Sequence, residues 1–224
     1  TIGPWPWPRY TMAKLVAKLA EDQPKLIGLD MLFPEADRNS PDAFVRLYPE
    51  LPKATADELR GLPRMDDLFG QVIGQVPIVM GRAGVDAKPL TSPPVLAVEA
   101  QFAAPLPKGV KSWGQAIANI PALDDVALGH GLLNGDPDDD GTVRYVPLVA
   151  RVAGQPMPGF ALELARVASG VDTLTPVARA DGVGGVRIGK AFLPTLPDGR
   201  MRVPFRAASK APPLSALDIL YDLE

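Results

Sequence analysis

Residues 25–33, KLIGLDMLF, constrain the fold most, because they are apolar on both alternating faces except at Asp30. A strand that is covered on both sides by helices has this pattern. A helix followed by such a strand favours parallel pairing in an α/β fold. The preceding residues 9–22 do have apolar side chains at the spacing of a one-sided helix, namely at Met12, Leu15, Val16 and Leu19.

A second helix–strand unit follows after a long connection. Residues 65–73 carry another helical apolar stripe, and residues 76–81 form a short apolar strand. Between the two units, residues 34–64 mix proline and charged residues without a clear period, which indicates a long, partly helical excursion on the surface. The Pro-rich residues 89–108 are typical of a loop around a short helix.

The second half of the sequence favours hairpins. Residues 131–153 contain strand-like runs on either side of an acidic turn, which predicts a hairpin. Residues 186–193 and 201–205 flank the turn pair Asp198-Gly199 and are expected to pair as antiparallel strands. We therefore predict one α/β domain over residues 1–224, with a mixed sheet flanked by helices, parallel units first and antiparallel hairpins later. Further helices are expected over residues 121–128, 160–167 and 214–223.

Composition excludes several classes of function. The net charge is -3 with Lys and Arg scattered along the chain, so no basic stripe is present to bind nucleic acid. Cysteine is absent and His130 is the only histidine, which excludes disulfides, thiolate chemistry and multi-His metal sites. The glycines at 182, 184 and 185 lack the Lys-Ser or Lys-Thr of a phosphate loop, and no cofactor is expected. No apolar run reaches the ~18 to 20 residues of a membrane span.

Two short motifs, one near the start of the chain and one in its second half, carry most of the functional information. The first is GPWPWPR at residues 3–9, in which the prolines hold the chain stiff and extended. The second is GLLNGDPDDDGTVRYVPL at residues 131–148, which contains Gly-x-x-Asn and Asp-Gly-x-x-Arg. Together with the apolar strand that ends in Asp30, these motifs make the sequence similar to the second type of cyclase- and histidine-kinase-associated sensory extracellular domain (CHASE type 2).

The resemblance implies signal input rather than catalysis. Domains of this family lie on the extracytoplasmic side of bacterial membrane proteins, whose cytoplasmic output module is a nucleotide cyclase, a histidine kinase or a Ser/Thr kinase. We therefore expect this chain to be a fragment that lacks flanking strands and transmembrane helices. The implied partners are an unknown small-molecule ligand and a second copy of the receptor in a homodimer.

Two alternatives belong to other classes of protein. The first is a scaffold that mediates receptor dimerisation without binding a ligand. The second is a secreted hydrolase that uses paired carboxylates as acid and base, for which Asp30, Glu35 and Asp37 are the nearest candidates. A ligand-filled pocket favours the sensor, whereas a large apolar self-interface favours the scaffold.

The aromatic motif is the first candidate ligand site. Trp5 and Trp7 either form the wall of a pocket or cover the core as a plug, since indoles carry a large apolar area. Arg9 is expected to pair with Asp30 at the end of the strand. Asp30 itself lies at the edge where open α/β sheets bind ligands, so all four residues are candidates for ligand binding.

The acidic turn permits two interpretations. Asp136, Asp138 and Asp140 take positions 1, 3 and 5 of a calcium loop, with Gly141 at position 6. The position of the closing bidentate glutamate is occupied by Pro147, so only half of the calcium motif is present. The alternative is a hairpin turn in which the aspartates accept hydrogen bonds from nearby backbone groups.

Polar residues on both sides of the acidic turn complete the candidates. Asn134, Asp140 and Arg144 lie close enough in sequence to converge, and the Arg144 fork suits either the Asp140 carboxylate or an external carboxylate or phosphate. His130, which lies between two glycines, is either an acid sensor that titrates near neutral pH or an incidental residue of a tight turn.

Overall fold

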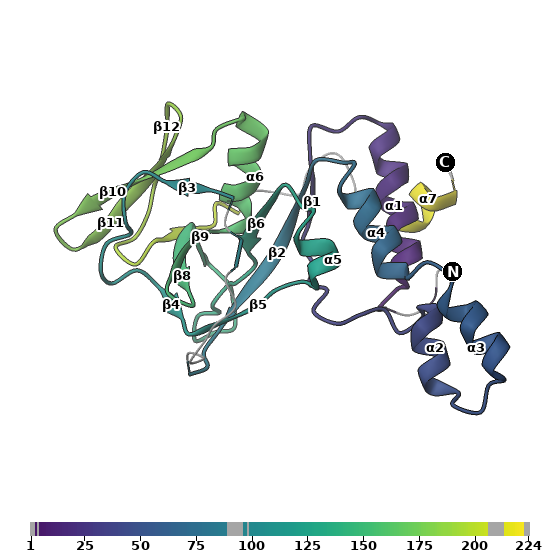
Figure 1. Cartoon of the computed structure of the whole chain (residues 1–224). Coiled ribbons are helices and arrows are strands. Elements are labelled where there is room, and N and C mark those ends of the chain that lie inside the picture. Colours follow the sequence, from purple (N-terminus) through teal and green to yellow (C-terminus); the bar gives the residue numbers. More distant parts are fainter. Residues whose placement is uncertain (1–2, 4, 89–95, 98, 206–212, 222–224) are drawn as a thin grey trace.

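The first half of the chain contains the two expected helix–strand units (Figure 1). The computed structural model describes residues 3, 5–88, 96–97, 99–205 and 213–221. In it, α1 (Arg9–Glu21) leads to β1 (Ile27–Leu29), and α4 (Met65–Ile73) leads to β2 (Ile78–Val85). Both helices bury the apolar stripes that their sequences predict, so these elements are confirmed.

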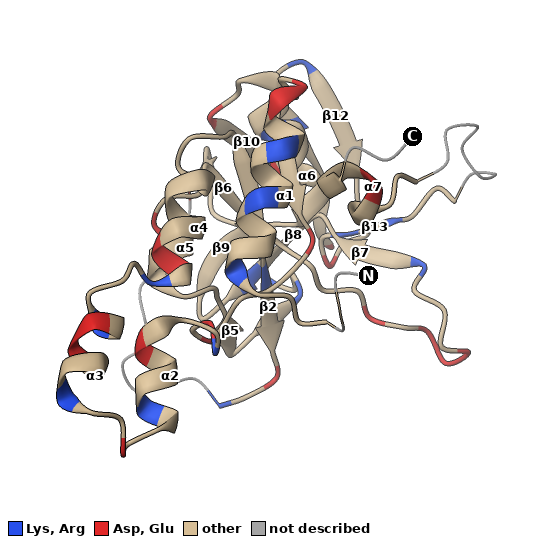
Figure 2. Ribbon diagram, turned by 90° about the vertical axis from the view of Figure 1, so that its right-hand side faces the viewer, with Lys and Arg blue, Asp and Glu red and all other residues tan. Residues whose placement is uncertain are grey.

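The long connection between the units is partly helical, as expected. It forms α2 (Pro41–Leu47) and α3 (Lys53–Arg60), which lie beside each other at the edge of the molecule (Figure 1). Figure 2 shows Lys, Arg, Asp and Glu interspersed on these two helices. Their exposed charges form pairs one helical turn apart, such as Arg46 with Asp42 at 2.6 Å.

β2 is the centre of the first sheet. β1 pairs with it in parallel, with Ile27 opposite Ile78, and β6 (Gly129–Leu132) pairs in parallel on its other edge, with Val79 opposite Gly129. The far end of β2 pairs in antiparallel fashion with β5 (Gln115–Ile117). The sheet is therefore mixed, with helices α1 and α4 on one face and α6 on the other (Figure 1).

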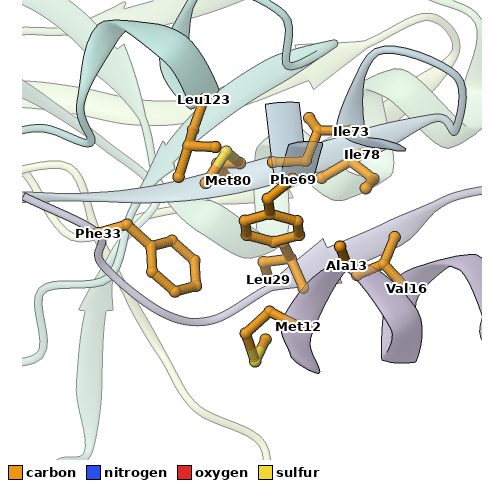
Figure 3. Packing of buried hydrophobic residues seen from close by; sticks show 10 residues of the cluster. All are labelled: Met12, Ala13, Val16, Leu29, Phe33, Phe69, Ile73, Ile78, Met80 and Leu123. Carbon is orange, nitrogen blue, oxygen red and sulfur yellow. The ribbon is translucent and has the colours of Figure 1, made fainter. Parts of the chain in front are cut away.

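The main hydrophobic core fills the space between this sheet and the helices α1 and α4 (Figure 3). Phe69 of α4 lies at its centre, completely buried, and its ring meets that of Phe33 edge to face with centroids 5.6 Å apart. Short α5 (Pro121–Asp124) closes the cluster from the side with Leu123. Ten buried residues make up the cluster: Met12, Ala13, Val16, Leu29, Phe33, Phe69, Ile73, Ile78, Met80 and Leu123.

The second half builds three small sheets around α6 (Phe160–Ser169), next to two further core clusters. The first has the order β12–β11–β10–β3 and the second the order β4–β8–β9, while β13 and β7 pair with each other. A final helix, α7 (Ala216–Tyr221), contacts α1. The strand bounds are β3 (Gln101–Phe102), β4 (Ser112–Trp113), β7 (Tyr145–Pro147), β8 (Val149–Val152), β9 (Gln155–Pro158), β10 (Thr173–Arg179), β11 (Gly182–Ile188), β12 (Ala191–Pro194) and β13 (Arg200–Arg202).

The predicted hairpin over residues 131–153 is wrong. β6 pairs with β2, whereas β7 pairs with β13 and β8 forms its own hairpin with β9. One antiparallel bridge, between Asp136 and Tyr145, is what the described residues retain of the expected pairing. Residues 129–132, before the acidic turn, pair with β2 because both faces of β6 are buried in this position.

The predicted pairing of residues 186–193 with 201–205 is also wrong. β11 pairs with β12 through the two-residue loop Gly189-Lys190, in which Gly189 has a φ of 55° that suits this tight turn. Residues 200–202 instead form β13 beside β7. In the Pro-rich stretch, residues 89–95 and 98 lie outside the described residues, and the described part forms β3 instead of the expected short helix.

Candidate functional site

A hollow of about 520 Å³ opens between the aromatic motif and the loop that follows β1. Residues 5–7 and Arg9 form one wall, and residues 32–39 form the other. The hollow thus lies beyond the carboxyl end of β1, the edge at which open α/β sheets bind ligands. It brings together Trp5, Trp7 and Arg9, all of which the sequence predicted as candidates.

The two indoles of the motif take different positions. Trp7 is partly buried against the main core, and its Nε1–H donates to the carbonyl of Gly3 at 3.2 Å. Trp5 is 54% exposed and meets Trp7 edge to face, with ring centroids 5.8 Å apart. Each of the two interpretations therefore applies to one residue of the motif. Trp7 covers the core as a plug, whereas Trp5 forms part of the wall of the hollow.

Arg9 is buried beneath the aromatic wall. Its Nε lies 3.3 Å from a carboxylate oxygen of Asp66, its Nη2 donates to the carbonyl of Glu35 at 2.8 Å, and its guanidinium lies 4.4 Å from the ring centre of Phe33. The expected pairing with Asp30 is not formed. Asp30 is exposed and does not line the hollow, because β1 ends before it, whereas α4 places Asp66 beside the first turn of α1.

The opposite wall is held in place by hydrogen bonds around Asp37. The Asp37 carboxylate accepts from the backbone N–H of Arg9 at 2.7 Å and from that of Asn39 at 2.9 Å. The Asp37 backbone N–H in turn donates to Asp66 at 2.9 Å. Both carboxylate oxygens of Asp37 thus hold the loop in place, and Asp30, another carboxylate of the hydrolase alternative, does not line the hollow. The hollow therefore has a fixed polar wall that faces an aromatic one.

The acidic turn is held together by ion pairs. Arg144 donates to both oxygens of Asp140, at 2.8 and 2.7 Å, and to Asp138 at 2.9 Å. Its hydrogen bonds lower the pKa of Asp140 to about 2. Asp136 pairs with Lys111 at 2.9 Å, so each carboxylate of the calcium hypothesis already lies next to a cation. Among the described residues, no group of three or more His, Cys, Asp or Glu is arranged to hold a metal ion.

Asn134 forms hydrogen bonds with the backbone of β2 and does not make the expected contact with Arg144. Its Oδ1 accepts from the backbone N–H of Gly84 at 2.7 Å, and its Nδ2 donates to the Gly84 carbonyl at 2.9 Å. The side chain thereby continues the hydrogen bonding along β2 beyond the end of β6. Arg144 faces a separate hollow of about 480 Å³, which is lined by Thr142, Arg144, Arg202 and residues 203–205.

Sequence reasoning missed a buried cluster of charged residues beside the first sheet. Arg82 of β2 is completely buried, and its Nη2 donates to the carboxylate of Asp124 in α5. His130 of β6 places Nε2 3.0 Å from Asp124 and Nδ1 3.0 Å from Glu99. The amide of Asn119 donates to the same Asp124 at 3.0 Å. These residues come from four separate segments, which the first sheet brings together.

The electrostatics of this cluster favour a charged imidazole. Burial opposes the charge on His130, but the adjacent carboxylates of Asp124 and Glu99 outweigh that effect and raise its pKa above the ordinary value. Burial likewise opposes ionisation of Asp124, yet hydrogen bonds from His130 and Arg82 hold the pKa of Asp124 far below its usual range. The pKa of Glu99 is also lowered, because the hydrogen bond from His130 outweighs the effect of burial.

Asn119 connects this cluster to the wall of the hollow. Its Oδ1 accepts from the backbone N–H of Phe33 at 2.9 Å, and its Nδ2 donates to Asp124 and to the carbonyl of Gly81 at 3.1 Å. Phe33 lines the hollow, so one buried amide touches both the candidate ligand site and the charged cluster.

One sequence signal could have located the cluster. Arg82 lies within the apolar strand IVMGRAGV, and a buried guanidinium requires a buried partner. The glycines on either side of His130 instead suggested a turn. They are needed because α6 crosses β6 closely, and a Cβ on Gly131 would lie 2.5 Å from the Cα of Phe160.

The structure is thus that of an α/β domain with a hollow between a fixed polar wall and an aromatic one, the kind of concave site at which proteins bind small molecules. A family model of the CHASE2 domain matches residues 1–223, and the chain belongs to this family. CHASE2 domains are sensory extracellular domains of cyclases and kinases and are not themselves catalytic. Neither the curated proteins nor the solved structures give a match. In the part of the chain that the structure describes, no helix is long and apolar enough to cross a membrane.

Proposed function

We propose that the chain is the extracytoplasmic input domain of a bacterial membrane receptor and that it binds a small molecule in the hollow beside Trp5. Family membership supports the sensory role. The proposed site depends on one observation: Trp5 presents its indole across the hollow from a wall whose polar groups are already bonded within the protein. The transmembrane helices and a cyclase or kinase output module would lie in other segments of the receptor.

The wall of the hollow offers a route from binding to signalling. The Asp37 carboxylate accepts a hydrogen bond from Arg9, the first residue of α1. The Asp37 backbone N–H donates to Asp66 in the first turn of α4. A ligand that displaces the loop therefore acts on both helices of the first layer. A shift from 1:99 to 99:1 between two arrangements requires ~5.5 kcal/mol of differential affinity, so the ligand has to contact several sides of the hollow.

A thermal-shift screen of the 224-residue chain tests this proposal. The probes are amino acids, organic acids, sugars and nucleosides, each at millimolar concentration. A ligand at ~100 times its dissociation constant should stabilise the chain by ~2.7 kcal/mol and raise its melting temperature. A screen in which no compound raises the melting temperature contradicts the proposal.

The site is tested by matched aromatic substitutions. Trp5→Ala removes the indole that faces the hollow and should abolish the stabilisation by any hit. Phe192→Ala is the control, because Phe192 is also a half-exposed aromatic residue but belongs to β12, away from the hollow. A hit that stabilises Trp5→Ala as much as it stabilises the wild type would place binding elsewhere.

A dimerisation scaffold is the second candidate, and exposed apolar side chains on α2 favour it. Phe44, Leu47 and Tyr48 are 45%, 68% and 49% exposed, and the rings of Phe44 and Tyr48 lie 4.5 Å apart. Such a patch suits contact with a second copy of the receptor in a homodimer. In sedimentation experiments, Leu47→Asp should then dissociate a dimer that the wild-type chain forms.

A further inference from the structure

The geometry points to a second input: we propose that the domain binds a proton at His130, a site separate from the hollow, and thereby responds to acidity. Both ring nitrogens of His130 lie 3.0 Å from carboxylate oxygens, one of Asp124 and one of Glu99. Carboxylates accept hydrogen bonds and cannot donate them. Only the imidazolium has an N–H on each nitrogen, so the hydrogen bond of Nδ1 with Glu99 and the ion-pair contact of Nε2 with Asp124 fit the protonated ring.

Charge balance leads to the same conclusion. Asp124 and Glu99 contribute two negative charges beside His130, and Arg82 of β2 contributes one positive charge. With a neutral imidazole the buried cluster carries one uncompensated negative charge, and with an imidazolium it carries none. Because an unpaired buried charge is costly, the folded chain holds the proton more tightly than an exposed histidine does.

The remaining charged groups near His130 compensate each other. α6, which packs against β6, contributes Glu163 and Arg166, and these two residues form a bidentate pair at 2.7 and 2.8 Å. Their net charge is zero, so they leave the balance around His130 unchanged.

Loss of the proton has a defined structural consequence. A neutral imidazole has one N–H and can donate to one carboxylate. The lone pair of its other nitrogen then faces a lone pair of the second carboxylate, and the two repel each other. Asp124 retains hydrogen bonds from Arg82 and Asn119, whereas the Glu99 carboxylate has His130 and its own backbone N–H as its hydrogen-bond partners within the described part of the chain. Glu99 is also the more exposed of the two carboxylates, at 27% against 13%. A neutral ring that keeps its N–H on Nε2, towards the more deeply buried Asp124, therefore releases Glu99.

Release of Glu99 acts on the link between the two halves of the molecule. Leu96 and Ala100, on either side of Glu99, belong to two different core clusters of the second half. β3, which starts directly after Ala100, is the edge strand of the sheet β12–β11–β10–β3. The imidazolium thus holds this segment against the first sheet, and this contact is lost when the ring loses its proton.

NMR titration of the 224-residue chain tests the proposal directly, because its only histidine gives a single set of imidazole signals. The expected pKa of His130 lies above the ordinary value of 6.5. The backbone amide signals of Gln101 and Phe102 should titrate with the same midpoint, since β3 follows Glu99. A pKa at or below 6.5 overturns the proposal, and so do amide signals that do not move with the imidazole.

Two variants separate the proton site from a merely structural role. Glu99→Gln removes one of the two carboxylates and should lower the pKa of His130, whereas Glu58→Gln, on the exposed face of α3, should leave it unchanged. The raised pKa also means that the melting temperature falls as the pH rises through it, and His130→Gln should remove this dependence. An unchanged pKa in Glu99→Gln contradicts the proposal even if His130→Gln fails to fold. A thermal-shift hit at the hollow, or its absence, does not affect this outcome.

Discussion

Replacement of Asn134 by alanine should destabilise the chain through the backbone of β2. The Asn134 side chain makes two hydrogen bonds with Gly84, at 2.7 and 2.9 Å, and each such bond contributes about 0.5 to 1.5 kcal/mol net. Loss of both lowers the free energy of unfolding by about 1 to 3 kcal/mol. With a urea m value of about 2 to 3 kcal/mol/M, the unfolding midpoint falls by roughly 0.3 to 1.5 M.

Urea unfolding followed by circular dichroism measures this change, and Asn39→Ala is the matched control. Asn39 is an exposed asparagine at the hollow, and Asn39→Ala removes the hydrogen bond of 3.2 Å from its Nδ2 to Asp37 but keeps the one from its backbone N–H, so a loss of about 0.5 kcal/mol or less is expected. Equal midpoints for Asn134→Ala and Asn39→Ala would refute the structural role of Asn134. Lost binding of a ligand with unchanged stability would return Asn134 to the ligand site.

Two further predictions concern the core and the acidic turn. Phe69→Ala empties the centre of the main core and should cost about 3 to 5 kcal/mol in the same urea experiment; a loss below about 2 kcal/mol would show that the site collapses around the gap. Arg144→Gln should raise the pKa of Asp140 from about 2 towards its ordinary 3.8, as measured on the carboxyl carbon by NMR. Because the native pKa is depressed, the Arg144 pair stabilises the fold above pH 3.8 and ceases to do so as the pH falls through about 2, and an unchanged pKa in the variant would contradict this account.

The first layer of the fold was predictable because its determinants are local. The helical stripes of α1 and α4 and the apolar strands after them repeat at periods that are visible within about 15 residues. The same holds for α6. These patterns specify the element and the face that it buries, which was enough to predict an α/β fold with helices on a mixed sheet.

Strand pairing in the second half was not predictable in the same way. β7 and β13 are each three residues long, and their partners Val146 and Met201 are far apart in the sequence. Such short strands carry almost no periodic signal, so the choice of partner depends on the packed tertiary structure. The loop Gly189-Lys190 was the local signal for the hairpin of β11 and β12. The nearby Asp198-Gly199 pair also fits a hairpin turn and was chosen in its place.

The candidate site was predicted in part for a similar reason. Trp5, Trp7 and Arg9 are neighbours in the sequence and remain together at the hollow. The partner of Arg9 came from another helix, Asp66, and no spacing rule indicates such a contact. The same limit hid the charged cluster, whose members become neighbours only after the sheet has formed.

The amide of Asn119 has a consequence for what a receptor of this kind can report. It holds the backbone of Phe33 with its oxygen and the Asp124 carboxylate with its nitrogen, so a displacement on one side strains the other. If a molecule bound in the hollow raises the affinity of His130 for its proton, thermodynamic reciprocity requires that protonation raise the affinity for that molecule by the same factor. The domain would thus act as a coincidence detector, whose output depends on the two stimuli arriving together.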